Sequence, residues 1–568
     1  MRLGMWLVSG KVVLTVPIAA LHGRPWQLNV DAVDWEERLH RELAFLYGAD
    51  APPLARELCA RARADARLPR SPGFDDPGEA ILITYGDQVS APGQCPLATL
   101  REFLGRHATG LVSGVHVLPF FPWSSDDGFS VKDFHAVDPV LGTWDDIRAL
   151  GADFDLMADA VFNHASVQGD WFAKFLRGTG DFGDFFVTVT GNPDLSRVIR
   201  PRALPLLTGF PTPEGTRKVW TTFSADQADL NFHNPRVMLA VSEALLLYLR
   251  QGARYIRLDA VGFIWKEPGT TCLHLPQAHA LVRAWRALTD GAAPGARIVT
   301  ETNVPHADNI SYFGNGRDEA QMVYNFALPP LVLHTICTGD ATALTRWAAG
   351  LQTPSDGTTF FNFLASHDGI GLNPARGILS DAQIGNLVDL ARTAGGFVGM
   401  KSLPDGTVAP YELNVSYFDA LAAGVDEETA VRRFTAAHAI AFALAGVPGI
   451  YFHSLFGSRG DADGARSSGI PRRINREKFR RDTLESELER PGSLRRRIFE
   501  NIAGLLRQRR GHRAFAPSSP QRILDAGAGI FAVERGEGAD RVLCLHEIAG
   551  RSQEHEGIRL APYEVRWS

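Results

Sequence analysis

The sequence predicts an α/β fold: a closed (β/α)8 TIM barrel with subdomain insertions over its mouth and a C-terminal β domain. Short β-branched runs alternate with helix-like stretches, the pattern of a parallel sheet whose strands are buried on both faces. Eight such runs suffice to close a barrel, and polar residues follow most of them, at the end where barrel enzymes keep their chemistry. The eight expected strands are residues 81–85, 114–119, 154–159, 255–259, 297–301, 322–325, 360–363 and 449–452.

Residues 1–78, ahead of the first strand, are expected to form an N-terminal extension and a helical prefix. Residues 35–66 have the periodicity of two amphipathic helices, with a break at Pro52-Pro53. Residues 68–79 are rich in Pro, Gly and Asp, which is typical of a linker.

Two connections within the expected catalytic barrel, residues 79–514, are much longer than an ordinary loop between a strand and a helix. We expect an inserted subdomain at 165–222 and a second long loop insertion at 370–432, both over the barrel mouth. Residues 515–568 change to short strand-like runs such as Gly529–Val533, which predict a small antiparallel β domain.

Composition argues against several classes of partner. The 568 residues carry a net charge of −6 without one concentrated basic run, so we expect no nucleic-acid and no membrane partner. Five widely spaced cysteines favour neither a disulfide framework nor a zinc site, and indicate a reducing, cytoplasmic location. Met1–Ala20 is apolar like a secretory signal peptide, but Ser9-Gly10-Lys11 divides the apolar run. We therefore favour an extension, or a start codon assigned too far upstream, over secretion.

Several ionisable residues lie at strand ends and should meet at the barrel mouth. Taken singly, such a residue is usually a cap or a structural side chain. Their placement at the ends of several barrel strands instead favours a catalytic site. The set is Asp159, His164, Arg257, Asp259, Glu301, His367 and Asp368.

These residue types fit cleavage of an α-glucosidic bond with retention of configuration. That reaction needs an ionised carboxylate nucleophile and a separate protonated carboxyl group, ~5 Å apart. Arg257 lies two residues before Asp259, on the same face of the strand, and can keep Asp259 ionised. Crowding by like charges should raise the pKa of the acid. A third carboxylate can stabilise the transition state, and His164 and His367 can donate hydrogen bonds to sugar hydroxyls.

These segments resemble the signature regions of the α-amylase superfamily, glycoside hydrolase family 13. Asp159–His164, Tyr255–Asp259, Glu301 and Phe363–Asp368 match them in family order. The resemblance implies that Asp259 is the nucleophile, Glu301 the general acid/base and Asp368 the transition-state stabiliser. It also implies that Arg257, His164 and His367 belong to the subsite that holds glucose.

A finer resemblance is to the sucrose-phosphorylase-like subfamily, whose members transfer glucose to phosphate without a metal or organic cofactor and give α-glucose 1-phosphate. It implies that Asp126 and Arg476 grip the distal side of glucose and that Phe223 is an aromatic platform. We add Gln227 to this sugar-binding set. The stretches that carry the resemblance are 126–129, 200–202, 219–223, 259–272, 324–330, 367–371 and 474–476.

The expected acceptor region departs from sucrose phosphorylase itself and looks more like the glucosylglycerate phosphorylases. Tyr411-Glu412-Leu-Asn414 carries Glu412 where sucrose phosphorylases usually have Gln. Residues 35–66, 451–455 and 473–478 depart in the same direction. We therefore expect Tyr411, Glu412 and Asn414 to contact an acceptor other than fructose, with D-glycerate favoured.

Phosphate and glycerate are small anions, so their subsite should present guanidinium groups. Glu412 would repel an anionic acceptor unless an arginine pairs with it, so glycerol and fructose stay open as neutral acceptors. The candidate arginines are Arg200, Arg202, Arg472 and Arg473, beside Arg476.

The favoured function is a retaining glycoside phosphorylase, with 2-O-α-glucosylglycerate ahead of sucrose and glucosylglycerol as substrate. An α-glucosidase-type hydrolase is the nearest alternative. A catalytically silent transporter subunit of the same fold is disfavoured, because all three acids are present. The expected partners are a sugar substrate, inorganic phosphate and a small polyol or hydroxy-acid acceptor, and the sequence leaves a homodimer open.

Overall fold

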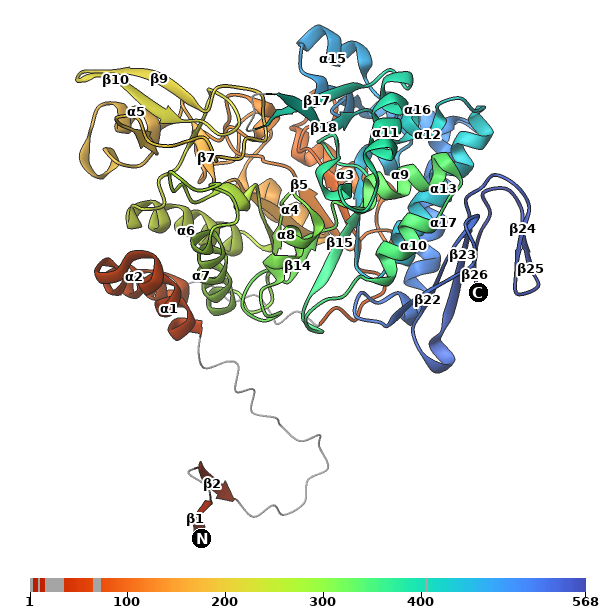
Figure 1. Cartoon of the computed structure of the whole chain (residues 1–568), viewed down its shortest axis with the longest axis horizontal. Coiled ribbons are helices and arrows are strands. Elements are labelled where there is room, and N and C mark those ends of the chain that lie inside the picture. The colour runs from red at the N-terminus through yellow and green to blue at the C-terminus, as the bar shows by residue number, and fades with distance from the viewer. Residues whose placement is uncertain (1–3, 9–10, 16–34, 65–72, 404–406) are drawn as a thin grey trace.

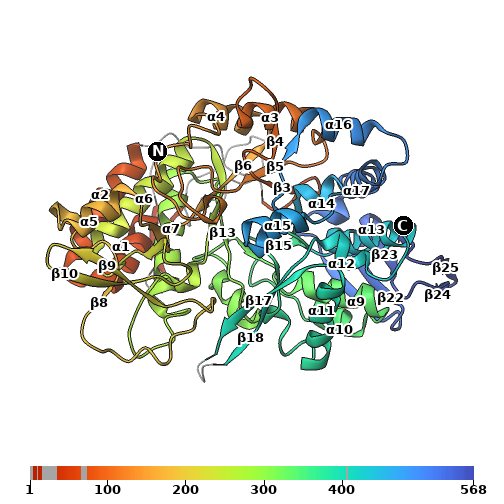
Figure 2. The same cartoon turned by 90° about the horizontal axis from the view of Figure 1, so that it is seen from above.

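The computed structural model describes residues 4–8, 11–15, 35–64, 73–403 and 407–568. Its centre is a closed barrel of eight parallel strands that pair in chain order, with the last strand returning to the first (Figures 1 and 2). The predicted fold class and all eight predicted strands are confirmed. The strands are β3 (Ile81–Thr84), β5 (Gly114–Val117), β6 (Asp155–Ala160), β12 (Ala253–Leu258), β13 (Arg297–Thr300), β14 (Met322–Tyr324), β15 (Thr359–Phe363) and β19 (Val447–Tyr451).

Helices surround the barrel, and local sequence explains where they start. The Asn234 side chain accepts a hydrogen bond from the Arg236 N–H, and Pro235 occupies the first turn of its helix. Asp426 caps another helix through the Thr429 N–H. The main barrel helices are α3 (Pro96–His107), α4 (Trp144–Asp153), α6 (Pro235–Arg250), α7 (Pro276–Ala292), α8 (His306–Ile310), α9 (Leu328–Thr338), α10 (Thr342–Ala349), α13 (Glu427–Ala443) and α17 (Leu494–Arg510).

The helical prefix consists of α1 (Trp35–Tyr47) and α2 (Ala51–Ala64), which pack against α6 and α7. Arg283 Nε, on α7, lies 2.7 Å from Glu42 Oε2 on α1. The break between the two helices falls at Gly48–Asp50, so its predicted position at Pro52-Pro53 is wrong. The two prolines lie in the first turn of α2, where a missing N–H leaves no helix bond unmade.

Part of the N-terminal region lies outside the described residues, including most of the expected extension and residues 68–72 of the expected linker. Within it, β1 (Gly4–Val8) and β2 (Lys11–Thr15) form an antiparallel pair. None of the described helices has both the length and the apolar character needed to span a bilayer.

Both long insertions lie above the carboxyl ends of the barrel strands, at the top of Figure 1. The first holds β7 (His164–Ser166), α5 (Asp170–Leu176), β8 (Thr188–Val189), β9 (Leu207–Thr212), β10 (Gly215–Trp220) and β11 (Gln227–Asp229). The second holds β16 (Ile370–Gly371), α11 (Asp381–Thr393), β17 (Phe397–Ser402), β18 (Val408–Asn414) and α12 (Tyr417–Ala422).

After β19 come α14 (Phe452–Leu455), α15 (Ala462–Ser468), the 3-10 helix η8 (Pro471–Asn475) and α16 (Arg481–Glu489). Short strands β4 (Val89–Ser90) and β20 (Phe479–Arg480) pair beside them. The tail forms an antiparallel sheet of β21 (Gln521–Leu524), β22 (Ile530–Arg535), β23 (Val542–Glu547) and β26 (Val565–Trp567), with a hairpin of β24 (Gln553–His555) and β25 (Ile558–Leu560). The domain boundaries at residues 78 and 514 stay predictions.

Candidate active site

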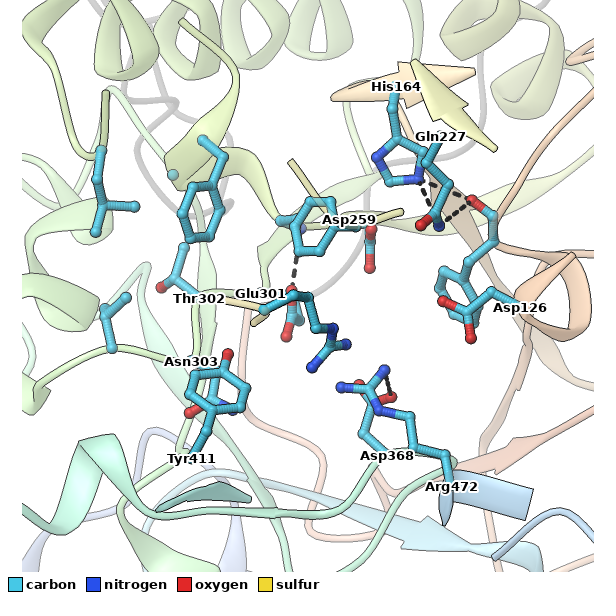
Figure 3. A pocket seen from close by; sticks show the side chains of 18 of the residues that line it. Asp126, His164, Gln227, Asp259, Glu301, Thr302, Asn303, Asp368, Tyr411 and Arg472 are labelled. Atoms are coloured by element: carbon cyan, nitrogen blue, oxygen red, sulfur yellow. Dashed lines mark hydrogen bonds and ion pairs between the residues drawn. The ribbon is translucent and has the colours of Figure 1, made fainter. Parts of the chain in front are cut away.

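A pocket of about 650 Å³ opens at the carboxyl ends of the barrel strands (Figure 3). Its walls come from the strand ends, from both insertions and from η8. Eleven of the predicted site residues line it: Asp126, His164, Arg202, Phe223, Gln227, Asp259, Glu301, His367, Asp368, Tyr411 and Arg472.

Arg257 lies beneath this pocket and binds the strand-end carboxylates together. Its side chain is buried, and its Nη1 donates to Asp259 Oδ1 at 2.8 Å and also to Asp159. Arg257 Nη2 lies 4.0 Å from Glu301 Oε2. Asp159 also pairs with His116 Nε2 at 2.7 Å, so one rigid buried network holds the cation under Asp259.

Glu301 is held by the backbone that follows Asp259. Ala260 has a φ of 48°, a left-handed conformation that is unfavourable for a residue with a side chain. This turn aims the Ala260 N–H at Glu301 Oε2, 3.0 Å away. Burial, followed by the charges of Asp259 and Asp368, raises the pKa of Glu301 to about 7. Burial is thus a larger cause than the like-charge crowding expected from the sequence.

Asp259 and Asp368 differ from Glu301 in their protonation. Burial raises the pKa of Asp259, but the adjacent Arg257 opposes that shift. Burial would also raise the pKa of Asp368, yet the nearby Arg472 and other cations outweigh it and hold the pKa well below its usual range. Arg472 Nη1 lies 2.5 Å from Asp368 Oδ1. Of the three carboxyl groups, Glu301 is therefore the one suited to carry a proton near neutral pH.

The two predicted histidines lie on the same side of the pocket, close to Phe129. His367 stacks on the Phe129 ring, with ring centroids 4.7 Å apart, and burial holds the pKa of His367 well below its usual value. His164 Nε2 lies 2.8 Å from the Phe129 carbonyl oxygen. Gln227 Nε2 lies 3.3 Å from the same oxygen, and the Phe223 ring centroid is 5.4 Å from that of His164.

Arg476 and two aspartates form a second charged group near these histidines. Arg476 is buried, and its Nη1 donates to Asp126 Oδ1 at 3.2 Å and to Asp127 Oδ2 at 2.9 Å. Both aspartates have positive φ values, 54° and 49°, within the 3-10 helix Asp126–Gly128. The residues that the resemblance assigns to glucose binding are thus brought together around one end of the pocket.

Two arginines, Arg202 and Arg472, also line the pocket. The Arg202 guanidinium lies 5.8 Å from the centroid of the Tyr411 ring. Arg472 comes from η8 and points toward Asp368, as Figure 3 shows. A pocket with two guanidinium groups beside carboxylates, histidines and an amide has the chemistry to bind a small anion next to a hexose.

Four predicted acceptor residues do not line the pocket. Arg200 donates to the Leu204 carbonyl of its own loop, and Arg473 pairs with Asp127 at 2.8 Å with its side chain half exposed. Glu412 and Asn414 lie on β18 and are buried beneath the surface of the pocket. Their predicted contact with substrate stays a prediction.

Several lining residues were not predicted, namely Phe129, Phe263, His274, Thr302 and Asn303. Thr302 and Asn303 directly follow Glu301, so their position after the strand was a usable signal. His274 lies in a loop with a positive φ of 54°, which the sequence does not reveal. Within the described segments, no group of three or more His, Cys, Asp or Glu side chains is placed to hold a metal ion.

Comparisons with known proteins agree with this geometry. Residues 110–368 match the family model of the α-amylase catalytic domain. A glucosylglycerate phosphorylase of Allomeiothermus silvanus is 51% identical over 543 residues, covering 92% of this chain and 97% of the relative. The chain belongs to the α-amylase family, in its sucrose-phosphorylase-like branch.

Among other members of this family, a glucosylglycerate phosphorylase is more similar to this chain than a sucrose phosphorylase is. A glucosylglycerate phosphorylase of Escherichia coli is 46% identical, covering 87% of this chain and 92% of the relative. A sucrose phosphorylase of Agrobacterium vitis is 32% identical over 79% of this chain and 91% of its own. The crystal structure of a sucrose 6F-phosphate phosphorylase from Thermoanaerobacter thermosaccharolyticum has a TM-score of 0.73 at 23% identity, covering 85% of this chain and 98% of that one, and shares the fold.

Proposed function

We propose that the protein is a retaining glycoside phosphorylase that converts 2-O-α-glucosylglycerate and phosphate into α-glucose 1-phosphate and glycerate. The observation that carries the proposal is a pocket that brings together the three predicted catalytic carboxyl groups and two arginines, in a chain 51% identical to a glucosylglycerate phosphorylase. A sucrose-type substrate is less well supported, because the sucrose phosphorylase relatives are only 27–32% identical.

In the first step, the Asp259 carboxylate attacks the anomeric carbon of glucose and the bond to the glycerate oxygen breaks. Glu301, protonated because burial raises its pKa to about 7, gives its proton to that oxygen. The products of this step are free glycerate and a glucosyl ester of Asp259. Asp368, ionised and directed at the pocket, stabilises the positive charge that develops on the sugar ring.

In the second step, a phosphate oxygen attacks the anomeric carbon from the side that glycerate left. Glu301, now ionised, accepts the phosphate proton, and the ester bond to Asp259 breaks. Two inversions leave the α configuration unchanged. Arg202 and Arg472 offer guanidinium groups to the phosphate, and the same groups suit the carboxylate of glycerate.

The test is an acceptor screen in the synthetic direction. α-Glucose 1-phosphate is supplied with D-glycerate, glycerol or fructose, and phosphate release is followed. We expect D-glycerate to be the best acceptor. If fructose is better by about tenfold or more, the protein is a sucrose phosphorylase, and if water accepts glucose as fast as any of the three, it is a hydrolase.

Stereochemistry gives an independent test. Proton NMR of the first product formed from glucosylglycerate and phosphate should show α-glucose 1-phosphate. A β-phosphate product would remove the double displacement and with it the role of Asp259.

The finer partner and location assignments belong to the same proposal. We propose a cytoplasmic protein, because all five cysteines, which lie in the described part of the chain, are unpaired, as is typical of a reducing compartment. A homodimer stays a prediction, which light scattering of the purified protein can check.

A further inference from the structure

Glu412 is a buried acid behind Arg472, a residue that lines the pocket, and Arg472 engages both of its carboxylate oxygens. Its Oε1 accepts from Arg472 Nε at 2.9 Å and its Oε2 from Arg472 Nη2 at 2.7 Å, a bidentate pair. Arg202 Nη1 lies 3.8 Å from Oε1. The Glu412 side chain is 4% exposed and does not line the pocket.

The sheet around Glu412 provides room for this side chain. Glu412 lies on the central strand β18, where it pairs with Gly371 of β16 on one side and Gly399 of β17 on the other. A Cβ atom at Gly399 would lie 2.8 Å from Glu412 Cγ. The glycine thus leaves the space that the carboxylate needs to reach toward Arg472.

Arg472 connects two acids that have different tasks. One edge of its guanidinium is bound by Glu412, while Nη1 lies 2.5 Å from Asp368 Oδ1 and faces the pocket. Without Glu412, the flexible arginine side chain would have no second anchor to keep it there. Arg473, the next residue, lacks this anchor and points to Asp127 instead.

We propose that Glu412 is a positioning residue for Arg472, and that Arg472, held in this way, makes the pocket select an anionic acceptor over a neutral one. The inference rests on the proposed glucosyl transfer to glycerate. It gives Glu412 no contact with the acceptor. It also explains why a carboxylate can lie near an anion site: its charge is matched by Arg472 and Arg202.

A glutamine in place of Glu412 could not form the same bidentate pair with Arg472. A carboxylate offers two acceptor oxygens to the two guanidinium nitrogens, whereas an amide offers one oxygen and directs an NH2 group at the other nitrogen. Glu412→Gln should therefore remove one of the two hydrogen bonds from Arg472 with almost no change in the volume of the side chain.

The experiment measures how the glucosyl group on the enzyme is partitioned between an added acceptor and water. Wild type, Glu412→Gln, Arg472→Gln and the double variant receive α-glucose 1-phosphate with subsaturating D-glycerate. The ratio of glucosylglycerate to free glucose is then measured in one reaction. This ratio compares an anion with water as acceptor, and losses in the first step cancel from it. Parallel reactions contain glycerol as a neutral acceptor. Arg466→Gln, an exposed arginine on α15, is the matched control and should leave both ratios unchanged.

We expect Arg472→Gln to lower the glycerate ratio by about tenfold or more, and Glu412→Gln to lower it in the same direction, while the glycerol ratio changes less than about threefold. If Glu412 acts through Arg472, the double variant should be within about twofold of Arg472→Gln alone. Losses that multiply in the double variant, or a Glu412→Gln variant that loses glycerol and glycerate equally, would overturn the inference.

Two further arms separate the possible failures. A wild type that makes no glucosylglycerate overturns the proposed function, and the inference with it. Glu412→Asp retains the charge but is one methylene shorter, so it should also lower the glycerate ratio. It replaces Glu412→Gln if that variant does not fold. An unchanged ratio in Glu412→Asp would contradict the positioning role.

Discussion

Two sets of charged residues lie at opposite ends of the barrel. They differ in the partners that compensate for the loss of water around their charges. At the amino end of the strands, Arg509 and Arg535 donate to backbone carbonyl oxygens. Arg509 reaches those of Glu79, Gly446 and Phe515 at 2.8–3.1 Å. Nearby, Glu79 accepts from both Tyr255 and Arg297. These partners join the barrel, α17 and the start of the C-terminal domain, so the charges at this end stabilise the architecture.

At the carboxyl end, by contrast, each of two arginines is shared between two carboxylates. Arg257 is shared between Asp159 and Asp259, and Arg472 between Asp368 and Glu412. The backbone is strained as well, with positive φ at Asp126, Asp127 and Ala260. The comparison teaches that buried charge by itself does not mark a site. A site is marked where charges compete for partners and the chain holds them in unfavourable conformations.

The largest expected effect is at the carboxyl end. Asp259→Asn should lower the turnover of glucosylglycerate by at least about a hundredfold, because covalent catalysis is lost. The fold should persist, since Arg257 retains Asp159 as its partner. Steady-state rates and thermal unfolding of the same preparation test both statements. A variant that keeps more than about a hundredth of the wild-type rate would remove Asp259 from the nucleophile role.

The opposite pattern is expected at the amino end. Arg509→Met should destabilise the fold by about 3 kcal/mol, because it leaves several buried carbonyl oxygens without a donor, yet the rate per folded molecule should not change. Arg507→Met, on the exposed side of the same helix, is the control and should cost less than about 0.5 kcal/mol. Denaturant unfolding measures the difference. Loss of activity in folded Arg509→Met would mean that the two ends are coupled.

The sequence predicted the strands and the three carboxyl groups that meet at the pocket because both are local features: a β-branched run, and an acid at its end or shortly after it. It did not separate Arg472 from Arg473, which differ only in where loop geometry points them. It also missed His116 as the partner of Asp159. The pairs Arg472–Glu412 and His116–Asp159 are 60 and 43 residues apart in the chain, so only the folded sheet reveals them.

The pH dependence of Glu301 sharpens the comparison, because it links catalysis to stability. In the proposed mechanism Glu301 must be protonated to release glycerate, so kcat/KM for glucosylglycerate should fall as pH rises through about 7. The folded-state pKa lies above the unfolded value, so the native state binds more protons between those values and stability falls as pH rises through this window. Glu301→Gln should abolish this loss of stability with rising pH.

Thermal unfolding at low and high pH measures this effect. Glu301→Gln should be inactive, similar to wild type in stability near pH 4, and more stable above pH 7 by about 1–3 kcal/mol. Glu489→Gln, at an exposed glutamate on α16, is the control and should show no such pH-dependent gain. If Glu301→Gln gains no stability at high pH, Glu301 is not the group that keeps its proton in the folded site.

The smallest expected effect tests the strain itself. Ala260 has a φ of 48°, which costs a residue with a side chain about 1 kcal/mol, whereas glycine adopts it freely. Ala260→Gly should therefore leave stability within about 0.5 kcal/mol of wild type, as relief of strain offsets the greater freedom of the unfolded chain. Ala439→Gly, in the buried interior of α13, has no strain to relieve and should cost about 1 kcal/mol or more. Because glycine retains the N–H that Glu301 accepts, the rate should fall less than about tenfold. Equal losses of stability in the two variants would show that the turn after Asp259 stores no strain, and that competition between charges alone distinguishes the carboxyl end from the amino end.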